Sequence, residues 1–347
     1  MKETTGCSSM ARASGFGPEG ESSILSTPAI KEGSLRVLVT GATGLLGRFI
    51  IQKFHGDHQL FGTYRSRKKG IFPDDSFNRF CPSDVLMYDW DLRNFQVGVS
   101  VFNLARPDVV IHCASSTDVD ACESSPHHME NNCVSTMNIS LLCDIFNCRL
   151  VFMSTDLVFG DDCKRPRYEH DTPNPIQDYG KSKLFGEHIV HSIVPWDRVV
   201  VVRTSWLYGW EHFGIRERDF PQRIAASLRE GNRNFFYNEQ VSVPTHAGIL
   251  ASALKELIQN PEKCRSTYHI TCRGHTSREN WIRTIADKYA DVVFMREYTA
   301  VQGKANRPAF SALNSGKFQI EFFTNLPHWR EELINYVYMI KSNDETP

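Results

Sequence analysis

The chain has 347 residues, and its 39 Lys and Arg against 40 Asp and Glu give a formal net charge of −1. This length is enough for a large core in one domain or in two closely packed lobes. The near-neutral balance argues against a nucleic-acid-binding surface and against a polybasic membrane patch. No apolar run approaches the roughly 20 residues that a transmembrane helix needs, which argues against a membrane span.

The N-terminal segment and the cysteines both indicate a cytoplasmic protein. Residues 1–33 are rich in Ser, Gly, Glu and Pro, with Phe16 as their one aromatic residue, so we expect an unstructured tail. They lack the apolar core of a secretory signal peptide. The 10 cysteines are irregularly spaced without a C-x-x-C pair, which argues against a disulfide framework and against a metal site.

From residue 34 onward, strand-like and helix-like segments alternate. Strands rich in Val, Ile and Leu are expected at 36–39, 59–64, 86–89, 108–113, 150–154 and 199–203. Helices are expected at 45–54, 129–146 and 179–192. Apolar strands separated by helices are typical of an α/β fold with a doubly wound parallel sheet covered on both faces. We therefore assign residues 34–205 to a Rossmann domain.

Beyond Trp206 the alternation weakens. Residues 206–247 hold aromatic side chains, charges and glycines, and residues 262–315 mix short strands with loops. Helical segments are expected at about 247–259, 278–290 and 327–341. We expect residues 206–347 to form mainly a smaller substrate-binding lobe. This lobe would be interleaved with the sheet and lie over its carboxyl edge, where ligands bind in such folds.

A glycine-rich turn, G-x-x-G-x-x-G, joins the first strand to the first helix. Its glycines allow a tight bend, close approach of the backbone to phosphate and close packing of helix on strand, and the helix N-terminus offers N–H groups to a pyrophosphate. An ordinary turn would explain a glycine triplet alone, but the strand before it and the helix after it favour a dinucleotide site. The expected cofactor-binding residues of this turn are Gly41, Thr43, Gly44, Leu45, Leu46 and Gly47.

The end of the second strand favours NADP over NAD. NAD sites usually carry an acid there for the ribose 2′-hydroxyl, but residues 62–69 contain none. Arg65 and Arg67 would instead suit a 2′-phosphate, with a solvated basic loop as the alternative. Asp91 and Leu92, after the third strand, could lie beside the adenine, although an ordinary turn or cap would also explain this Asp.

The segment Tyr179-Gly-Lys-Ser-Lys183 opens the helix after the fifth strand. Tyr179 and Lys183 are four residues apart and share one helix face, just beyond Thr155 at the strand end. A nearby ammonium lowers the pKa of a phenol, so we expect Tyr179 to protonate a developing alkoxide near pH 7. Lys183 would also bind the nicotinamide ribose, and Thr155 would hold the substrate oxygen. A packed helix residue is the alternative for Tyr179.

Both motifs resemble those of the extended short-chain dehydrogenase/reductase superfamily, T-G-x-x-G-x-x-G and Y-x-x-x-K. More narrowly, the chain is similar to the dTDP-4-dehydrorhamnose reductase family at residues 106–123, 154–159, 203–209, 238–245 and 307–313. This resemblance implies an NADPH-dependent oxidoreductase that reduces a nucleotide-linked 4-keto-6-deoxy sugar. Hydride would go to the sugar C4 carbonyl, and Tyr179 would be the proton donor.

The resemblance also implies roles for residues outside the two motifs. By position, the catalytic residues are Thr155, Tyr179 and Lys183. Tyr179 and Lys183 would also contact the cofactor, together with Cys113, Ala114 and Thr204. The substrate would be bound by Thr117, Asp118, Asp156, Trp206 and Gln240. Asn132 matches a structural Asn that supports the active-site Lys through water. Residues 210–219 depart from the family loop, which leaves the nucleotide and the sugar open.

The alternative within the same family is the regulatory β subunit of methionine adenosyltransferase, which keeps the cofactor site but modulates a partner enzyme. Residues 36–48, the basic loop after the second strand and the polar N-terminal extension resemble that subunit. Residues 116–120 and 203–206 resemble the reductases instead, and we favour the reductase on these substrate-side residues. The alternative implies a methionine adenosyltransferase catalytic subunit as partner.

A third reading is an epimerase or a dehydratase of the superfamily. Such enzymes usually retain NAD, so the missing acid after the second strand counts against it. Many relatives form homodimers, and the surface helix at 129–146 is a candidate for such contact, although the sequence identifies no interface.

Overall fold

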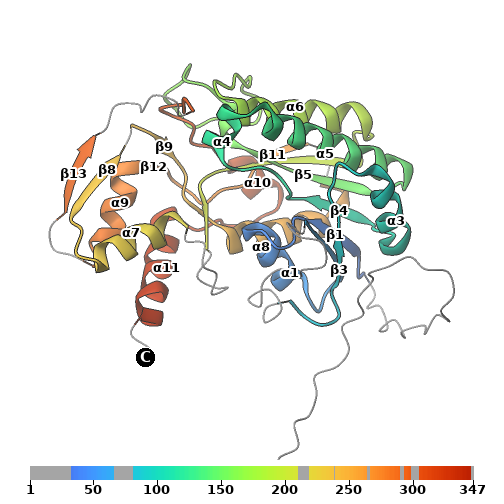
Figure 1. Cartoon of the computed structure of the whole chain (residues 1–347), viewed down its shortest axis with the longest axis horizontal. Helices are drawn as coiled ribbons and strands as arrows, with labels where there is room; N and C mark the ends of the chain where they lie inside the picture. Colours follow the sequence, from blue (N-terminus) through green and yellow to red (C-terminus); the bar gives the residue numbers. More distant parts are fainter. Residues whose placement is uncertain are drawn as a thin grey trace, which may run out of the picture.

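A parallel seven-stranded sheet lies at the centre of the computed structural model (Figure 1). The structure describes residues 33–65, 81–209, 219–237, 239–263, 266–289, 293–297 and 305–344. The strand order is β11-β6-β5-β4-β1-β2-β3. The strands are β1 (Arg36–Thr40), β2 (Gln59–Tyr64), β3 (Leu86–Asp89), β4 (Val109–His112), β5 (Arg149–Thr155), β6 (Val199–Thr204) and β11 (Thr267–His269).

Helices cover both faces of this sheet (Figure 1). One side carries α1 (Leu45–Phe54), α8 (Ala247–Gln259) and α10 (Gly316–Glu321), and the other carries α3 (Phe95–Ala105), α5 (Pro126–Ile145) and α6 (Asp178–Ile193). Because side chains alternate along a strand, Val37 and Val39 face the first set and Leu38 faces the second. The α/β doubly wound fold expected from the sequence is therefore confirmed.

A second group of elements surrounds its own core, built on Tyr208, Trp281 and Tyr336. Figure 1 shows this lobe beside the sheet, with the C-terminal helix at its lower edge. Its elements are β7 (Leu207–Tyr208), α7 (Phe220–Arg229), β8 (Asn234–Tyr237), β9 (Val241–Ser242), β10 (Thr245–His246), β12 (Thr276–Ser277), α9 (Arg278–Ala286), β13 (Phe294–Glu297) and α11 (Trp329–Asp344).

The six expected strands are present to within one residue at each end, but several other elements of the sheet region differ from expectation. The helix α3 was not expected. A short strand within 262–315 was expected, but not that β11 would join the central sheet, and α5 begins at Pro126 rather than at residue 129. Ahead of α5 lies α4 (Val119–Ser124), and η1 (Asp156–Val158) follows β5 directly, while η3 (Pro261–Lys263) follows α8. Within the described residues, no helix is both long and apolar enough for a membrane span.

Candidate active site and cofactor-binding residues

The turn between β1 and α1 has the backbone geometry of a phosphate cradle. Gly41 has φ +67°, and a Cβ there would lie 2.9 Å from the Cα of Ala114 at the end of β4. A Cβ on Gly47 would lie 2.3 Å from the carbonyl oxygen of Gly41. The exposed Gly44 is the N-cap of α1, and no side chain caps the helix. The first N–H groups of α1 therefore remain available to an anion.

A buried hydroxyl points to the same ligand position. Thr204 ends β6 and pairs in register with Thr155 at the end of β5. Its Oγ1 is buried and has no hydrogen-bond partner among the described residues. An unsatisfied buried hydroxyl is costly, so its partner is best explained as a bound molecule at the carboxyl edge of the sheet. The glycine turn and Thr204 together fit a dinucleotide.

The residues expected around the adenosine lie along the ends of β2 and β3. Arg65 is exposed at the end of β2, and Arg67 lies outside the described residues. The Asp91 carboxylate accepts from the Arg93 guanidinium at 2.9 and 2.5 Å, and these bonds, aided by Arg65, hold its pKa below the usual value. Leu92 is buried in the core. Asp91 is thus engaged by a neighbouring cation in this structure.

The N-terminus of α6 is fixed against the end of β5. The N-cap Gln177 accepts from the Gly180 N–H, and its Nε2 donates to the Leu157 carbonyl at 2.9 Å. A Cβ on Gly180 would lie 2.0 Å from that same carbonyl oxygen, so only glycine fits. This close contact brings the helix turn that carries Tyr179 next to the strand end that carries Thr155.

The pKa of Tyr179 is raised, mainly by burial and further by the charges of Asp156 and Cys122. The expectation that a nearby ammonium lowers this pKa is therefore wrong for this structure, because desolvation is the largest effect and it favours the neutral phenol. A phenol with a raised pKa stays protonated near pH 7 and can still donate its proton.

Lys183 is 4% exposed, and its ammonium lies 4.3 Å from the centroid of the Phe152 ring. Burial lowers its pKa to about 8, against the opposing effect of Glu187. Asn132, expected to support this lysine, donates to Ser182 at 3.1 Å and also holds the backbone of Ser116.

Asp156 is 2% exposed and accepts from three hydroxyls. Its Oδ2 accepts from Ser242 at 2.7 Å and from Ser311 at 2.6 Å, and its Oδ1 accepts from Thr155 at 3.1 Å. Burial raises its pKa, although these bonds oppose the shift. The carboxylate therefore joins the end of β5 to two segments of the lobe.

Trp206 has φ +39°, which is a strained backbone conformation for this residue type. Its indole stacks on Trp281 with centroids 5.0 Å apart, and the Arg278 guanidinium lies 3.8 Å from its centroid. The Arg278 guanidinium is also 5.1 Å from the centroid of Trp281. If Arg278 and Trp281 lay on opposite faces of the Trp206 ring, they would be roughly 7 Å apart. Both groups therefore cover one face of Trp206.

The remaining expected substrate residues differ in their surroundings. Gln240 is buried, and its carbonyl accepts from the Arg278 N–H at 2.8 Å. Thr117 and Asp118 are exposed, and Asp118 is the N-cap of α4, where it accepts from Ala121 at 3.0 Å. Cys113 follows β4 and has its pKa raised to about 12 by burial.

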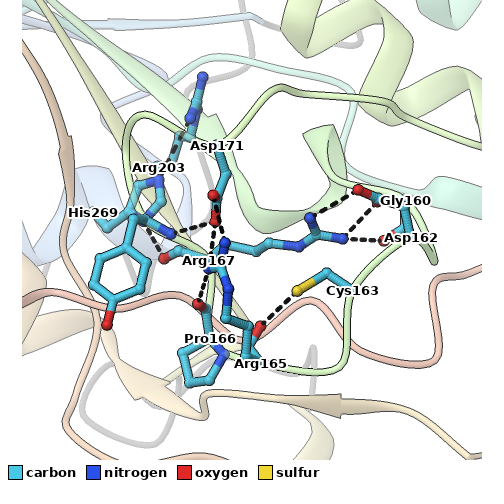
Figure 2. A network of polar contacts seen from close by, with 10 residues as sticks. Gly160, Asp162, Cys163, Arg165, Pro166, Arg167, Asp171, Arg203 and His269 are labelled. Carbon is cyan, nitrogen blue, oxygen red and sulfur yellow. Dashed lines mark hydrogen bonds and ion pairs between the residues drawn. The ribbon is translucent and has the colours of Figure 1, made fainter.

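A buried ion pair lies on the far side of the α6 start. Glu187 accepts from Arg203 at 2.7 and 2.9 Å and from Ser154 at 2.6 Å. Figure 2 shows how Arg203 contacts His269, which in turn contacts the Arg167 carbonyl. The network ties β5, β6, β11 and α6 together beneath the site.

The sequence interpretation missed Gln177, Arg278 and the two serines on Asp156. The position of Gln177, just before the helix that carries Tyr179, was the one available signal for its role. The signal was weak because Gln is not a usual N-cap residue. Ser242 and Ser311 lie 86 and 155 residues from Asp156, so no local spacing could have found them.

Comparison with known proteins shows what the chain resembles. Residues 35–341 match the family described as RmlD substrate binding domain. A dTDP-4-dehydrorhamnose reductase of Mycobacterium tuberculosis is 32% identical over 252 residues, which are 70% of this chain and 80% of that protein. A probable low-salt glycan biosynthesis reductase, Agl14 of Haloferax volcanii, is 29% identical over 273 residues, 78% of this chain and 85% of that protein.

A crystal structure of dTDP-4-dehydrorhamnose reductase from Bacillus anthracis in complex with NADP is similar with a TM-score of 0.71 and 25% identity. The similarity covers 88% of this chain and 99% of that one.

Proposed function

The chain belongs to the RmlD family of extended short-chain dehydrogenases/reductases, and we propose that it is an NADPH-dependent reductase of a nucleotide-linked 4-keto-6-deoxy sugar. The observation that carries this proposal is the meeting of three elements at one sheet edge. The end of β5 with Thr155, the start of α6 with Tyr179 and the end of β6 with the unsatisfied Thr204 lie side by side.

The glycine turn and Thr204 would hold the cofactor. Gly41, Gly44 and Gly47 would admit the pyrophosphate, and Lys183 would bind the nicotinamide ribose. Arg65 would favour NADP over NAD by pairing with a 2′-phosphate. When bound, NADPH would supply the hydride for the sugar C4 carbonyl.

The protein itself would supply the proton and the orientation. Tyr179, protonated because its pKa is raised, would donate to the carbonyl oxygen as negative charge develops there. Thr155 donates to Asp156 in this structure, so its hydroxyl would have to rotate to hold the substrate oxygen. That rotation would free Oδ1 of Asp156 for a hydroxyl of the sugar, while Oδ2 stays held by Ser242 and Ser311.

The sugar would lie against the substrate lobe. The face of Trp206 opposite Arg278 and Trp281 would pack on the apolar 6-deoxy end of the sugar, and the buried Gln240 amide would bind a hydroxyl or carbonyl group. Thr117 and Asp118 would lie at the outer edge, where Asp118 is also needed as a helix cap.

The test is NADPH oxidation with a panel of dTDP- and UDP-linked 4-keto-6-deoxy sugars. We expect oxidation with at least one sugar nucleotide and slower oxidation with NADH. No oxidation with any of them, together with stable co-elution with a methionine adenosyltransferase catalytic subunit, would contradict the reductase and favour a regulatory protein.

A further inference from the structure

We propose that Phe152 is a positioning residue for Lys183, whose ammonium it holds against the face of its ring, and that Glu187 supports the same charge from one helical turn away. The inference rests on the role proposed above for Lys183 in binding the nicotinamide ribose.

The ammonium of Lys183 is largely removed from water. The side chain is 4% exposed, and its Nζ makes neither a hydrogen bond nor an ion pair within the part of the chain that the structure describes. The ring of Phe152 lies against this charge, with 4.3 Å from Nζ to the ring centroid. A cation over an aromatic face is held most strongly when both are removed from water.

The ring of Phe152 is itself fixed. Phe152 is fully buried on β5, and a Cβ on Gly186 of α6 would lie 2.6 Å from the ring. The ring therefore fills the space that a side chain at residue 186 would need. The His112 ring, from the neighbouring strand β4, lies beside it with centroids 5.9 Å apart. A ring fixed in this way would hold the Lys183 ammonium in one position, one turn along α6 from Tyr179.

Glu187 gives the second support. It follows Lys183 by four residues on the same face of α6, and its carboxylate is held by Arg203 and Ser154. Its charge opposes the effect of burial on the pKa of Lys183. The buried His112 has its pKa lowered to about 3, and burial raises the pKa values of Cys113 after β4 and Cys133 on α5, so all three groups are neutral near pH 7.

The chain offers a matched control in Phe102. Phe102 is also fully buried and packs in the same core as Phe152. Its ring faces Trp90 and Phe146, and no cation lies over it among the described residues. Replacing either phenylalanine by leucine removes the same apolar volume, but only one replacement removes the ring from beneath Lys183.

The experiment compares Phe152→Leu with Phe102→Leu. NADPH affinity is measured by titration between pH 6.5 and 9.5, and stability is measured by urea unfolding. We expect similar losses of stability, but about five- to tenfold weaker NADPH binding at pH 7.5 in Phe152→Leu alone. We also expect the alkaline loss of NADPH binding to move to lower pH in that variant, because the charged form of Lys183 has lost its support.

Equal NADPH affinities and equal pH profiles in the two variants would overturn the inference. If Phe152→Leu does not fold, Phe152→Met, which fills more of the space, is compared with Phe102→Met by the same measurements.

Lys183→Met separates this inference from the function on which it rests. If that variant binds NADPH as tightly as the parent protein, the role proposed for Lys183 is wrong, and the inference is wrong with it. If Lys183→Met loses NADPH binding while the two phenylalanine variants behave alike, only the role of Phe152 is overturned.

Discussion

Tyr179 and Lys183 share one helix face, but burial acts on them in opposite ways. Desolvation disfavours the charged form of each, so it raises the pKa of the phenol and lowers the pKa of the ammonium. The phenol therefore keeps its proton well above pH 7, and the lysine keeps its charge only up to about pH 8. A proton donor and a cationic ribose ligand are thus both in their useful forms near neutrality.

Replacing Tyr179 with Phe removes the proton donor and leaves the ring in place. We expect turnover with the best sugar nucleotide to fall by roughly 10²- to 10⁴-fold, which is the usual contribution of a general acid. The affinity for NADPH should change by less than about twofold, since the cofactor is held mainly by the glycine turn and Lys183. Unchanged turnover would remove Tyr179 from the reaction.

At the scale of elements, two glycines of the turn before α1 are needed for different reasons. Gly47 is required by the protein itself, because a Cβ there would lie 2.3 Å from the carbonyl of Gly41 and 2.6 Å from the Cα of Ala42. Gly44 has φ −74°, which any residue adopts, and a Cβ there would meet only the Gly41 carbonyl at 3.2 Å. Close approach of phosphate is then the remaining reason for glycine at 44.

We therefore expect Gly47→Ala and Gly44→Ala to fail in different ways. Gly47→Ala should lower the free energy of unfolding by about 1–3 kcal/mol through overpacking. Gly44→Ala should stay within about 1 kcal/mol of the parent protein but bind NADPH at least about tenfold more weakly, a loss near 1.4 kcal/mol. Urea unfolding and NADPH titration measure the two effects. Parental NADPH affinity in Gly44→Ala would contradict a pyrophosphate at this turn.

A second prediction at this scale concerns the joint between the sheet and the lobe. Ser242 and Ser311 both donate to the buried carboxylate of Asp156, and bonds to a charged group contribute about 1.5–3 kcal/mol each. We expect Ser242→Ala and Ser311→Ala each to lower the free energy of unfolding by about that amount. In an Asp156→Asn background both losses should shrink, because the acceptor is then neutral.

Urea unfolding of the four combinations of Ser311→Ala and Asp156→Asn gives the coupling directly. Ser252→Ala is the control, since that hydroxyl donates to the Gly248 carbonyl within α8 and not to a carboxylate of the described residues. Equal losses in both backgrounds would show that the serines do not act through the carboxylate.

The elements that the sequence predicted are those with a local signal. The inner strands are continuous apolar runs, and the glycine turn and the Tyr179–Lys183 pair lie within ten residues each. The strand β11 is only three residues long and, among the described strands, pairs only with β6. Three residues are too few to show the alternation of side chains by which a strand is recognised. The helix α3 contains Val and Phe at positions that also suit a strand.

The substrate side was less predictable for a different reason. The joint at Asp156 and the support of Trp206 by Arg278 connect residues between 72 and 155 positions apart in the chain. Such contacts depend on how the lobe packs on the sheet, and this packing is a property of the folded chain. The roles of these side chains therefore follow from the structure and not from their spacing.

At the scale of the whole molecule, the network beneath the site joins the lobe-side strand β11 to the rest of the sheet. His269 is fully buried, its Nε2 faces the Arg203 guanidinium at 3.4 Å, and its Nδ1 lies 3.0 Å from the Arg167 carbonyl. Nδ1 must therefore carry the hydrogen, while Nε2 accepts. Burial and Arg203 lower the pKa of His269 from 6.5 to about 3, so the folded protein keeps it neutral.

Acid should therefore weaken the fold through this histidine. Between about pH 3 and 6.5 the unfolded chain binds the proton and the folded chain does not, so stability falls as the pH falls through 6.5. At pH 5 the loss is about 2 kcal/mol for one such imidazole. The measurement is urea unfolding at pH 7 and at pH 5. The free energy of unfolding should fall between these pH values by about 2 kcal/mol less in His269→Gln than in the parent protein. The control variant His127→Gln, which changes a side chain that is 82% exposed, should behave like the parent. An equal pH dependence in all three proteins would mean that His269 is protonated in the folded state, with its positive charge directed at Arg203.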